Sequence, residues 1–171
     1  MKDRLFEIWF ALRCGIANKE FQPLLDSYGT PYDLVEQNKW TYDTLMEMIK
    51  GVTVDPTDEN GRWGMLSEVS APYYFFLGLG KKTLVNNGGE FVSNIESEEV
   101  MSTLQKTMSL VVNPDVMIVN NGVWFGGQDV WNNATKVFKS GNALFRSNAL
   151  SSVNGLMANK VHEQHYIHGT P

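Results

Sequence analysis

The chain has 171 residues, of which 43% are hydrophobic and 19% are charged, so one globular domain with a sizeable core is possible. Its formal net charge of −5 argues against a surface for duplex nucleic acid, because phosphate binding normally requires a basic stripe. Cys14 is the only cysteine, which excludes an intrachain disulfide.

The first segment of the chain is expected to form short helices. The apolar run from Leu5 to Ile16 contains Glu7 and Arg13, so it is too short and too charged for a transmembrane helix. No export signal is visible either. Two further short helices are predicted, one that ends before Gly29 and one that begins at Pro31.

A capped amphipathic helix, an acidic turn and a short strand follow one another in the next stretch. Thr41 is a good helix N-cap, and Gly51 is expected to end the helix. Residues 55–61 form a turn-rich loop with too few oxygen ligands at alternating spacing for a calcium site of the EF-hand type. Residues 62–66 are predicted to form a strand.

Ser67 is then predicted to cap a helix that carries a run of aromatic residues, and a small hairpin is expected around the turn at residues 86–89. The next helix is expected to begin at Ser97. Its buried face is predicted to consist of apolar residues at helical spacing, namely Val100, Met101, Leu104, Met108 and Val111.

The last third of the chain is expected to contain a glycine-rich loop, a helix and a buried strand. The loop spans residues 116–127 and includes an extended piece, and the helix begins at Asp129. Gly141 is predicted to end this helix, and residues 142–145 form the strand.

Several of these pieces, in this order, resemble the extracellular solute-binding proteins (family 1) of carbohydrate ABC transporters. The likeness covers Asn38 to about Gly155, and the matching pieces are Lys39–Leu45, Asp55–Gly64, Ser70–Gly80, Asn94–Val100 and Lys136–Phe145. The resemblance implies an α/β chain, a helix-rich partial type II periplasmic-binding-protein fold with small β-sheet pieces. It divides the chain into a helical segment (1–38), a solute-binding-protein-like lobe (39–156) and a C-terminal tail (157–171).

The same resemblance implies a set of ligand-binding residues. Aromatic side chains would stack on a sugar ring, Glu68 would accept a hydrogen bond from a sugar hydroxyl, and polar residues after the last strand would add further hydrogen bonds. Packing in the core is the alternative for the aromatic run, and helix capping is the alternative for the polar residues. The implied set is Glu68, Tyr73, Tyr74, Trp124, Arg146, Ser147 and Asn148.

The function implied by the family is capture of a sugar or oligosaccharide as the substrate-binding component of an ABC importer, with the transporter permease as partner. Full-length relatives are extracellular or attached to the cell surface. No cofactor, metal, nucleic acid or membrane span is expected. Because no export signal is visible, the chain is expected to be a fragment with weak or no binding by itself, or a truncated product without activity.

An alternative resemblance is confined to the N-terminal segment. Phe10–Lys19 and Leu24–Leu34 resemble the N-terminal helical region of DNA-processing protein A, although Ala17 stands where a second glycine is usual. That family implies a cytoplasmic module associated with single-stranded DNA. Residues 18–20 and 24–39 also resemble the approach to the first matching piece in the solute-binding proteins. The two resemblances therefore share the same N-terminal residues, and both remain open.

Catalytic and metal motifs find little support in the sequence. There is no Gly-x-Ser-x-Gly elbow, and Cys14 is far in sequence from any histidine, so the chain is not expected to be an enzyme. His162, His165 and His168 are spaced to allow metal chelation on one helical face, but a solvated tail is the expected state so close to the chain end.

Overall fold

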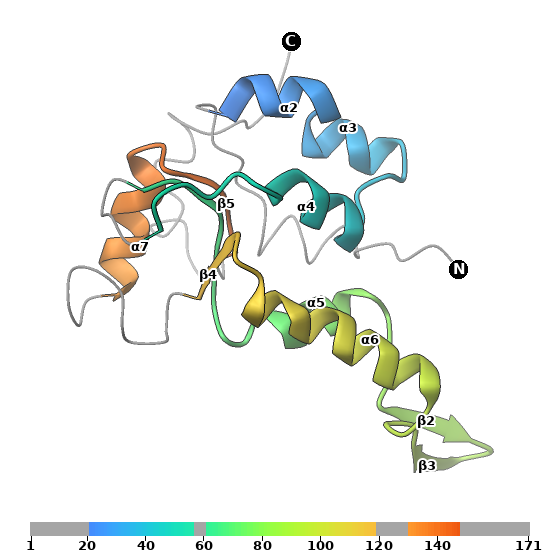
Figure 1. Cartoon of the computed structure of the whole chain (residues 1–171). Coiled ribbons are helices and arrows are strands. Elements are labelled where there is room, and N and C mark those ends of the chain that lie inside the picture. The colour runs from blue at the N-terminus through green and yellow to red at the C-terminus, as the bar shows by residue number, and fades with distance from the viewer. Residues whose placement is uncertain (1–20, 57–60, 119–129, 148–171) are drawn as a thin grey trace.

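The computed structural model describes residues 21–56, 61–118 and 130–147 (Figure 1). These residues form a mixed α/β arrangement with a three-stranded parallel sheet and a separate two-stranded antiparallel sheet. The prediction of a helix-rich α/β chain with small sheets is therefore confirmed at this level.

The helices and strands follow one another in an order that places helices between the parallel strands. In chain order the elements are α2 (Gln22–Tyr28), α3 (Pro31–Glu36), α4 (Tyr42–Ile49), β1 (Trp63–Ser67), α5 (Ala71–Gly78), β2 (Leu84–Asn87), β3 (Glu90–Ser93), α6 (Glu98–Met108), the 3-10 helix η2 (Ser109–Val112), β4 (Val116–Ile118), α7 (Val130–Lys139) and β5 (Ala143–Arg146). The parallel strands lie in the order β4-β1-β5, so β1 is the central strand.

Three helices begin at side chains that cap their first turns. The Thr41 hydroxyl accepts a hydrogen bond from the Thr44 N–H at 3.1 Å, and the Ser97 hydroxyl accepts one from the Val100 N–H at 3.3 Å. Thr30 begins α3 with a reciprocal capping box that involves Asp33. Each cap satisfies a backbone donor that has no partner within its helix, so the start of the helix is encoded locally.

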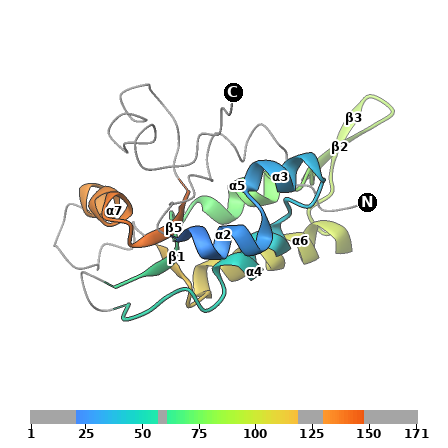
Figure 2. The same cartoon turned by 90° about the horizontal axis from the view of Figure 1, so that it is seen from above.

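The parallel sheet separates two apolar cores. Val116 and Ile118 of β4 face the larger core, which also contains residues of α2, α3, α4 and α5, while Met117 packs against the smaller core beneath α7. Figure 2 shows α7 beyond one side of the strands and α2, α4 and α5 beyond the other. All residues of β1 and β5 are buried, as expected for strands of a parallel sheet covered on both faces.

The first two described helices share the larger core with the rest of the chain. Leu25 of α2 and Leu34 of α3 belong to the same buried cluster as Trp40 and Leu45. In addition, the Arg62 guanidinium lies 4.6 Å from the centroid of the Phe21 ring, which joins the beginning of the described chain to the residue before β1.

The predicted helix cap at Ser67 is wrong. Ser67 ends β1 instead of capping a helix, and α5 begins after Ser70, which makes no side-chain capping bond. Ser67 cannot cap the helix because its backbone belongs to β1, where it pairs with Ile118 of β4.

The predicted buried face of α6 is also partly wrong. Met101 and Met108 are exposed, whereas Thr103 and Thr107 are buried. The two threonine hydroxyls donate to backbone carbonyls one turn earlier, Thr103 to Glu99 at 2.7 Å and Thr107 to Thr103 at 3.1 Å. Because their polar atoms are satisfied within the helix, these residues can face the core in place of the methionines.

The β2–β3 hairpin lies at the end of the molecule opposite α7 (Figure 1). Apart from the half-buried Val85, every residue of its two strands is exposed, and Phe91 retains 75% of its surface. Gly88 and Gly89 form the turn with positive φ values of 65° and 106°, as two-residue hairpin turns require. The hairpin therefore contributes little to either core.

Candidate ligand-binding site

The three parallel strands end at one edge of their sheet, and this edge contains polar residues. Ser67 ends β1, Ile118 ends β4 and Arg146 ends β5. The register confirms the common edge, because Ser67 pairs with Ile118 and Leu66 pairs with Arg146. In open α/β sheets, ligands bind outside the carboxyl ends of the strands, so this edge is the candidate site.

Arg146 is the most unusual residue at the edge because its charged side chain is 95% buried, with a relative exposure of 5%. Its Nη1 donates a hydrogen bond to the Thr135 hydroxyl of α7 at 2.8 Å. Burial lowers the pKa of the guanidinium to about 10, and the charge of Glu68 acts in the opposite direction. A buried arginine must be held by hydrogen bonds and opposite charge, and both are present here.

Glu68 and Ser147 lie directly beyond the strand ends. Glu68 is half-buried, and its Oε2 accepts a hydrogen bond from the Ser70 hydroxyl at 3.2 Å. Ser147 is half-buried, and its backbone N–H donates to the Leu66 carbonyl at 2.8 Å, which extends the β1–β5 pairing by one step. The strands thus place both residues beside Arg146.

Tyr73 and Tyr74 lie in the first turn of α5, which starts just after β1 at this same edge. Tyr73 is 59% exposed, and its ring lies 5.9 Å from that of Tyr74 at an angle of 56°. By contrast, Phe75 and Phe76 are buried. The aromatic run is therefore divided between core packing and an exposed ring at the strand ends.

Sequence reasoning missed two polar residues of this edge. The Ser67 hydroxyl is fully buried and has no hydrogen-bond partner among the residues that the structure describes. Thr135, the partner of Arg146, lies on α7 eleven positions before it. Ser67 could have been predicted as a site residue, because a serine at the end of an apolar strand is visible in the sequence. The hydrogen bond between Thr135 and Arg146 could not, because it depends on how α7 packs on the sheet.

Some predicted site residues cannot be located in this arrangement. Trp124 and Asn148 lie outside the described residues, as does the histidine-containing stretch 161–168. Within residues 21–56, 61–118 and 130–147, no group of three or more His, Cys, Asp or Glu residues is placed to hold a metal ion. In the same ranges, no helix is both long enough and apolar enough to cross a membrane.

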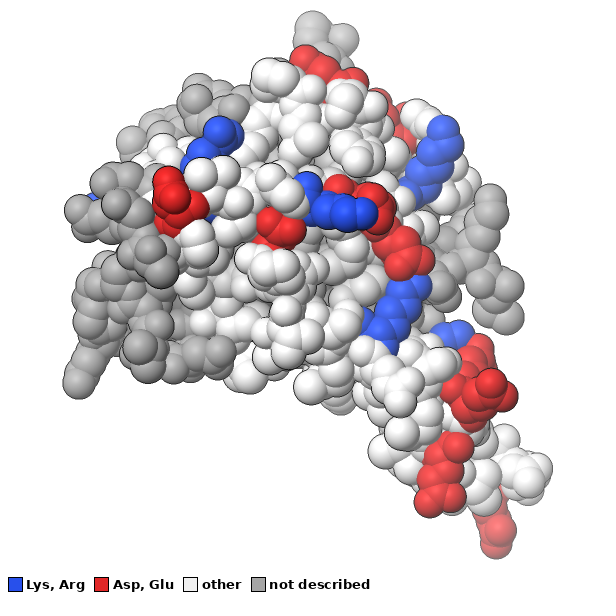
Figure 3. All heavy atoms as spheres, viewed as in Figure 1, with Lys and Arg blue, Asp and Glu red and all other residues white. Residues whose placement is uncertain are grey.

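Charged residues of both signs are mixed on the face shown in Figure 3. Lysine and arginine side chains alternate with acidic ones there, and acidic side chains gather toward the hairpin end. This face of the described residues has no continuous basic stripe of the kind that nucleic-acid phosphates need.

Comparisons with known proteins add no assignment to this geometry. No protein-family model matches the chain, and neither the search of curated proteins nor the search of solved structures finds a match.

Proposed function

We propose that the chain captures a carbohydrate as the substrate-binding component of an ABC importer, and that its partner is the transporter permease. The observation that carries the proposal is that Glu68 and Arg146 lie at the carboxyl edge of one parallel sheet, and that Tyr73 lies in the first turn of the helix that follows β1. The family resemblance of residues 38–155 supports the same reading, as does the α/β arrangement of the described residues.

The chemistry of the three side chains suits a sugar ligand. The exposed face of the Tyr73 ring offers an apolar platform for the C–H side of a pyranose. Glu68 is half-buried and accepts hydrogen bonds from hydroxyl groups, and the buried Arg146 supplies a charge of the opposite sign. Binding of this kind needs no covalent step, so the proposed protein binds its ligand without changing it.

The proposal also includes a partial type II periplasmic-binding-protein fold and the extracellular or cell-surface setting that the resemblance implies. In such a fold, two lobes close around the ligand by a hinge motion. We therefore expect one lobe to bind a saccharide only weakly, with a dissociation constant in the millimolar range.

A titration followed by amide chemical shifts in NMR tests the proposal. D-glucose, D-galactose, maltose and cellobiose are each added to the labelled full chain up to high millimolar concentration. We expect saturable shifts for at least one saccharide, concentrated at residues 67–74 and 146–147. Absence of saturable shifts with every saccharide, or shifts confined to distant residues, would overturn it.

A tyrosine pair supplies the matched variants for that titration. Tyr73→Ala removes the proposed stacking ring and should abolish the saturable shifts. Tyr32→Ala removes another exposed tyrosine, located on α3, and should leave them unchanged. Equal loss in the two variants would mean that the shifts do not report binding at the strand ends.

A further inference from the structure

Glu68 and Arg146 form a pair of opposite charges across two neighbouring strands. Arg146 pairs in register with Leu66, and Glu68 follows two positions beyond Leu66 along the chain. Alternate residues of an extended chain point to the same side, so the pairing brings the carboxylate toward the guanidinium. Within the part of the chain that the structure describes, the charge of Glu68 acts to raise the pKa of the Arg146 guanidinium.

Among the described residues at the strand ends, the formal charges of Glu68 and Arg146 cancel. Arg146 alone would place a positive charge in a mostly dry environment, since its side chain is 5% exposed. Such a charge attracts carboxylates, which arginine binds in a bidentate manner. Glu68 already supplies that negative charge from within the protein.

A ligand that carries its own carboxylate would meet Glu68 at this edge. Two like charges placed close together disfavour binding, and because Glu68 is half-buried, solvent and salt screen this repulsion only in part. A ligand with hydroxyl groups alone faces no such repulsion and can still donate hydrogen bonds to the Glu68 carboxylate.

We infer that Glu68 determines ligand specificity, and that it makes the site select uncharged saccharides over uronic acids. This inference rests on the proposed function. It goes beyond it because it assigns a charge class to the ligand and makes one side chain responsible for the choice.

Matched pairs of monosaccharides test the inference on the full chain. D-glucose is compared with D-glucuronate, and D-galactose with D-galacturonate, at constant ionic strength near pH 7 by the same amide shifts. The neutral member of at least one pair should bind about tenfold or more tightly than its uronate. Equal or tighter binding of the uronate by the unmodified chain would overturn the inference.

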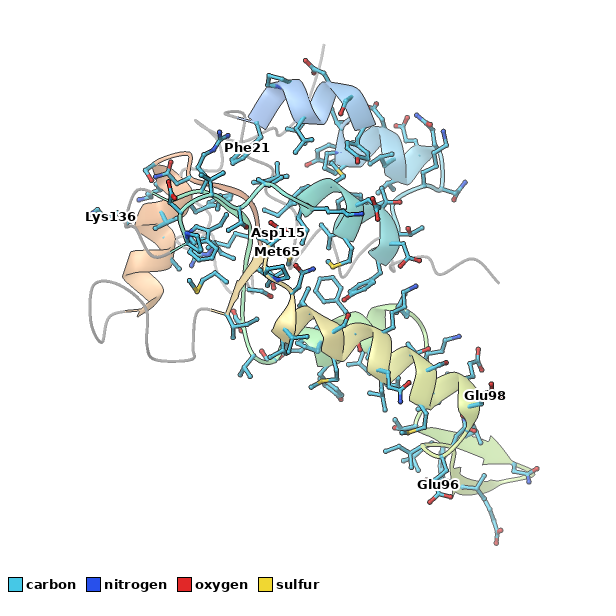
Figure 4. All side chains as sticks on the ribbon, in the orientation of Figure 1. Phe21, Met65, Glu96, Glu98, Asp115 and Lys136 are labelled. Carbon is cyan, nitrogen blue, oxygen red and sulfur yellow. The ribbon has the colours of Figure 1, made fainter. Side chains whose placement is uncertain are left out.

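Glu68→Gln removes the negative charge and keeps the shape of the side chain. The variant should bind the uronate more tightly than the unmodified chain does, so that the ratio between neutral and acidic ligand falls about tenfold or reverses. Glu96→Gln makes the same change of net charge beside the hairpin, far from Met65 in the sheet (Figure 4), and should keep the original ratio.

The outcomes distinguish this inference from the proposed function. If Glu68→Gln folds and its ratio equals that of the unmodified chain, saccharide binding stands and the role of Glu68 is wrong. If no saccharide of either class binds the unmodified chain, the proposed function fails and the inference with it. A thermal melt shows whether Glu68→Gln is folded. If it is not folded, the ratio of neutral saccharide to uronate binding by the unmodified chain decides whether the inference stands.

Discussion

Arg146 donates a hydrogen bond from Nη1 to the Thr135 hydroxyl, 2.8 Å away, and thereby ties the last residue of β5 to the middle of α7. The guanidinium remains buried at this point, and burial lowers its pKa to about 10. A buried charged residue at the carboxyl end of a parallel strand, where ligands bind in many open α/β sheets, is a candidate functional residue.

Arg146→Met should therefore raise stability while it removes saccharide binding. Methionine fills similar space without a charge to desolvate. Replacement of a buried ion pair by apolar residues is often neutral or stabilising, and removal of one partner alone is costly where the remaining charge is fully buried. Glu68 is half-buried and still accepts the hydrogen bond from the Ser70 hydroxyl in this variant. The substitution therefore leaves no fully buried charge without a partner. We expect the free energy of unfolding in urea to rise by about 1 to 3 kcal/mol.

The control for this change is Lys136→Met, which removes an exposed positive charge from α7 (Figure 4). It should change the free energy of unfolding by less than about 0.5 kcal/mol, as most surface substitutions do. A loss of more than about 1 kcal/mol in Arg146→Met would show that the guanidinium stabilises the fold, contrary to this prediction.

Asp115→Asn should weaken the attachment of the segment after α4 to the start of β4. The two carboxylate oxygens of Asp115 accept hydrogen bonds from the Gly51 N–H at 2.8 Å and the Thr53 N–H at 3.1 Å. Asparagine would turn an amide donor toward one of these donors, so we expect a loss of about 2 kcal/mol in urea unfolding.

Asp43→Asn is the matched control for Asp115→Asn. Asp43 pairs with Lys106 at 2.8 Å, but its side chain is 67% exposed, and exposed ion pairs contribute little. We expect its effect to stay below about 1 kcal/mol. Equal losses in the two variants would contradict the role given to Asp115.

Gly64→Ala should destabilise the chain because α4 passes very close to β1 at this residue. A β-carbon at Gly64 would lie 2.8 Å from both the Ile49 Cβ and the Ile49 carbonyl oxygen, and 2.9 Å from the Asp115 carbonyl oxygen. Overpacking of this kind costs about 1 to 3 kcal/mol, measurable by urea unfolding. Adding Ile49→Val should not restore stability, since the Ile49 atoms in the clash remain in valine. Full recovery of stability in the double variant would contradict this, because it would mean that the clash involves the outer atoms of the Ile49 side chain.

The dependence of stability on alkaline pH should change in Tyr42→Phe. Burial raises the pKa of the Tyr42 phenol above 10.0, and this outweighs the opposing effects of a hydrogen bond with Ser109 and the charge of Lys106. Above pH 10, Tyr42 loses its proton in the unfolded chain but keeps it in the folded chain. Deprotonation therefore lowers the free energy of the unfolded state relative to the folded state, and stability falls as pH rises.

Urea unfolding at pH 8 and pH 10.5 measures this effect. The variant should lose about 1 kcal/mol at pH 8, because the Tyr42 hydroxyl donates to the Lys106 carbonyl at 3.2 Å. The difference between the two proteins should shrink at pH 10.5. A difference that is constant across pH would contradict the role of the Tyr42 proton.

Local signals in the sequence predicted many of the elements well. Caps at Thr41 and Ser97, the glycine-rich turn of the hairpin and the proline at the start of α3 each act through the backbone of their nearest neighbours. Such signals act within a few residues, so they can be read without knowing the rest of the fold. The methionines of α6 show where such local prediction fails, because the hydrophobicity of single residues does not determine which of two possible helix faces packs against the core.

The sequence by itself determined the helix-rich α/β character of the chain and identified Glu68, Tyr73, Arg146 and Ser147 as candidates. Only the tertiary structure decided that they share one edge, since this follows from the parallel order β4-β1-β5 and its register. It alone also decided that Tyr73 is exposed, Arg146 is buried and Thr135 is its partner. The physical reason is that burial and pairing depend on which distant segments pack together. Thr135 can accept the hydrogen bond from Arg146 only because α7 packs across the sheet.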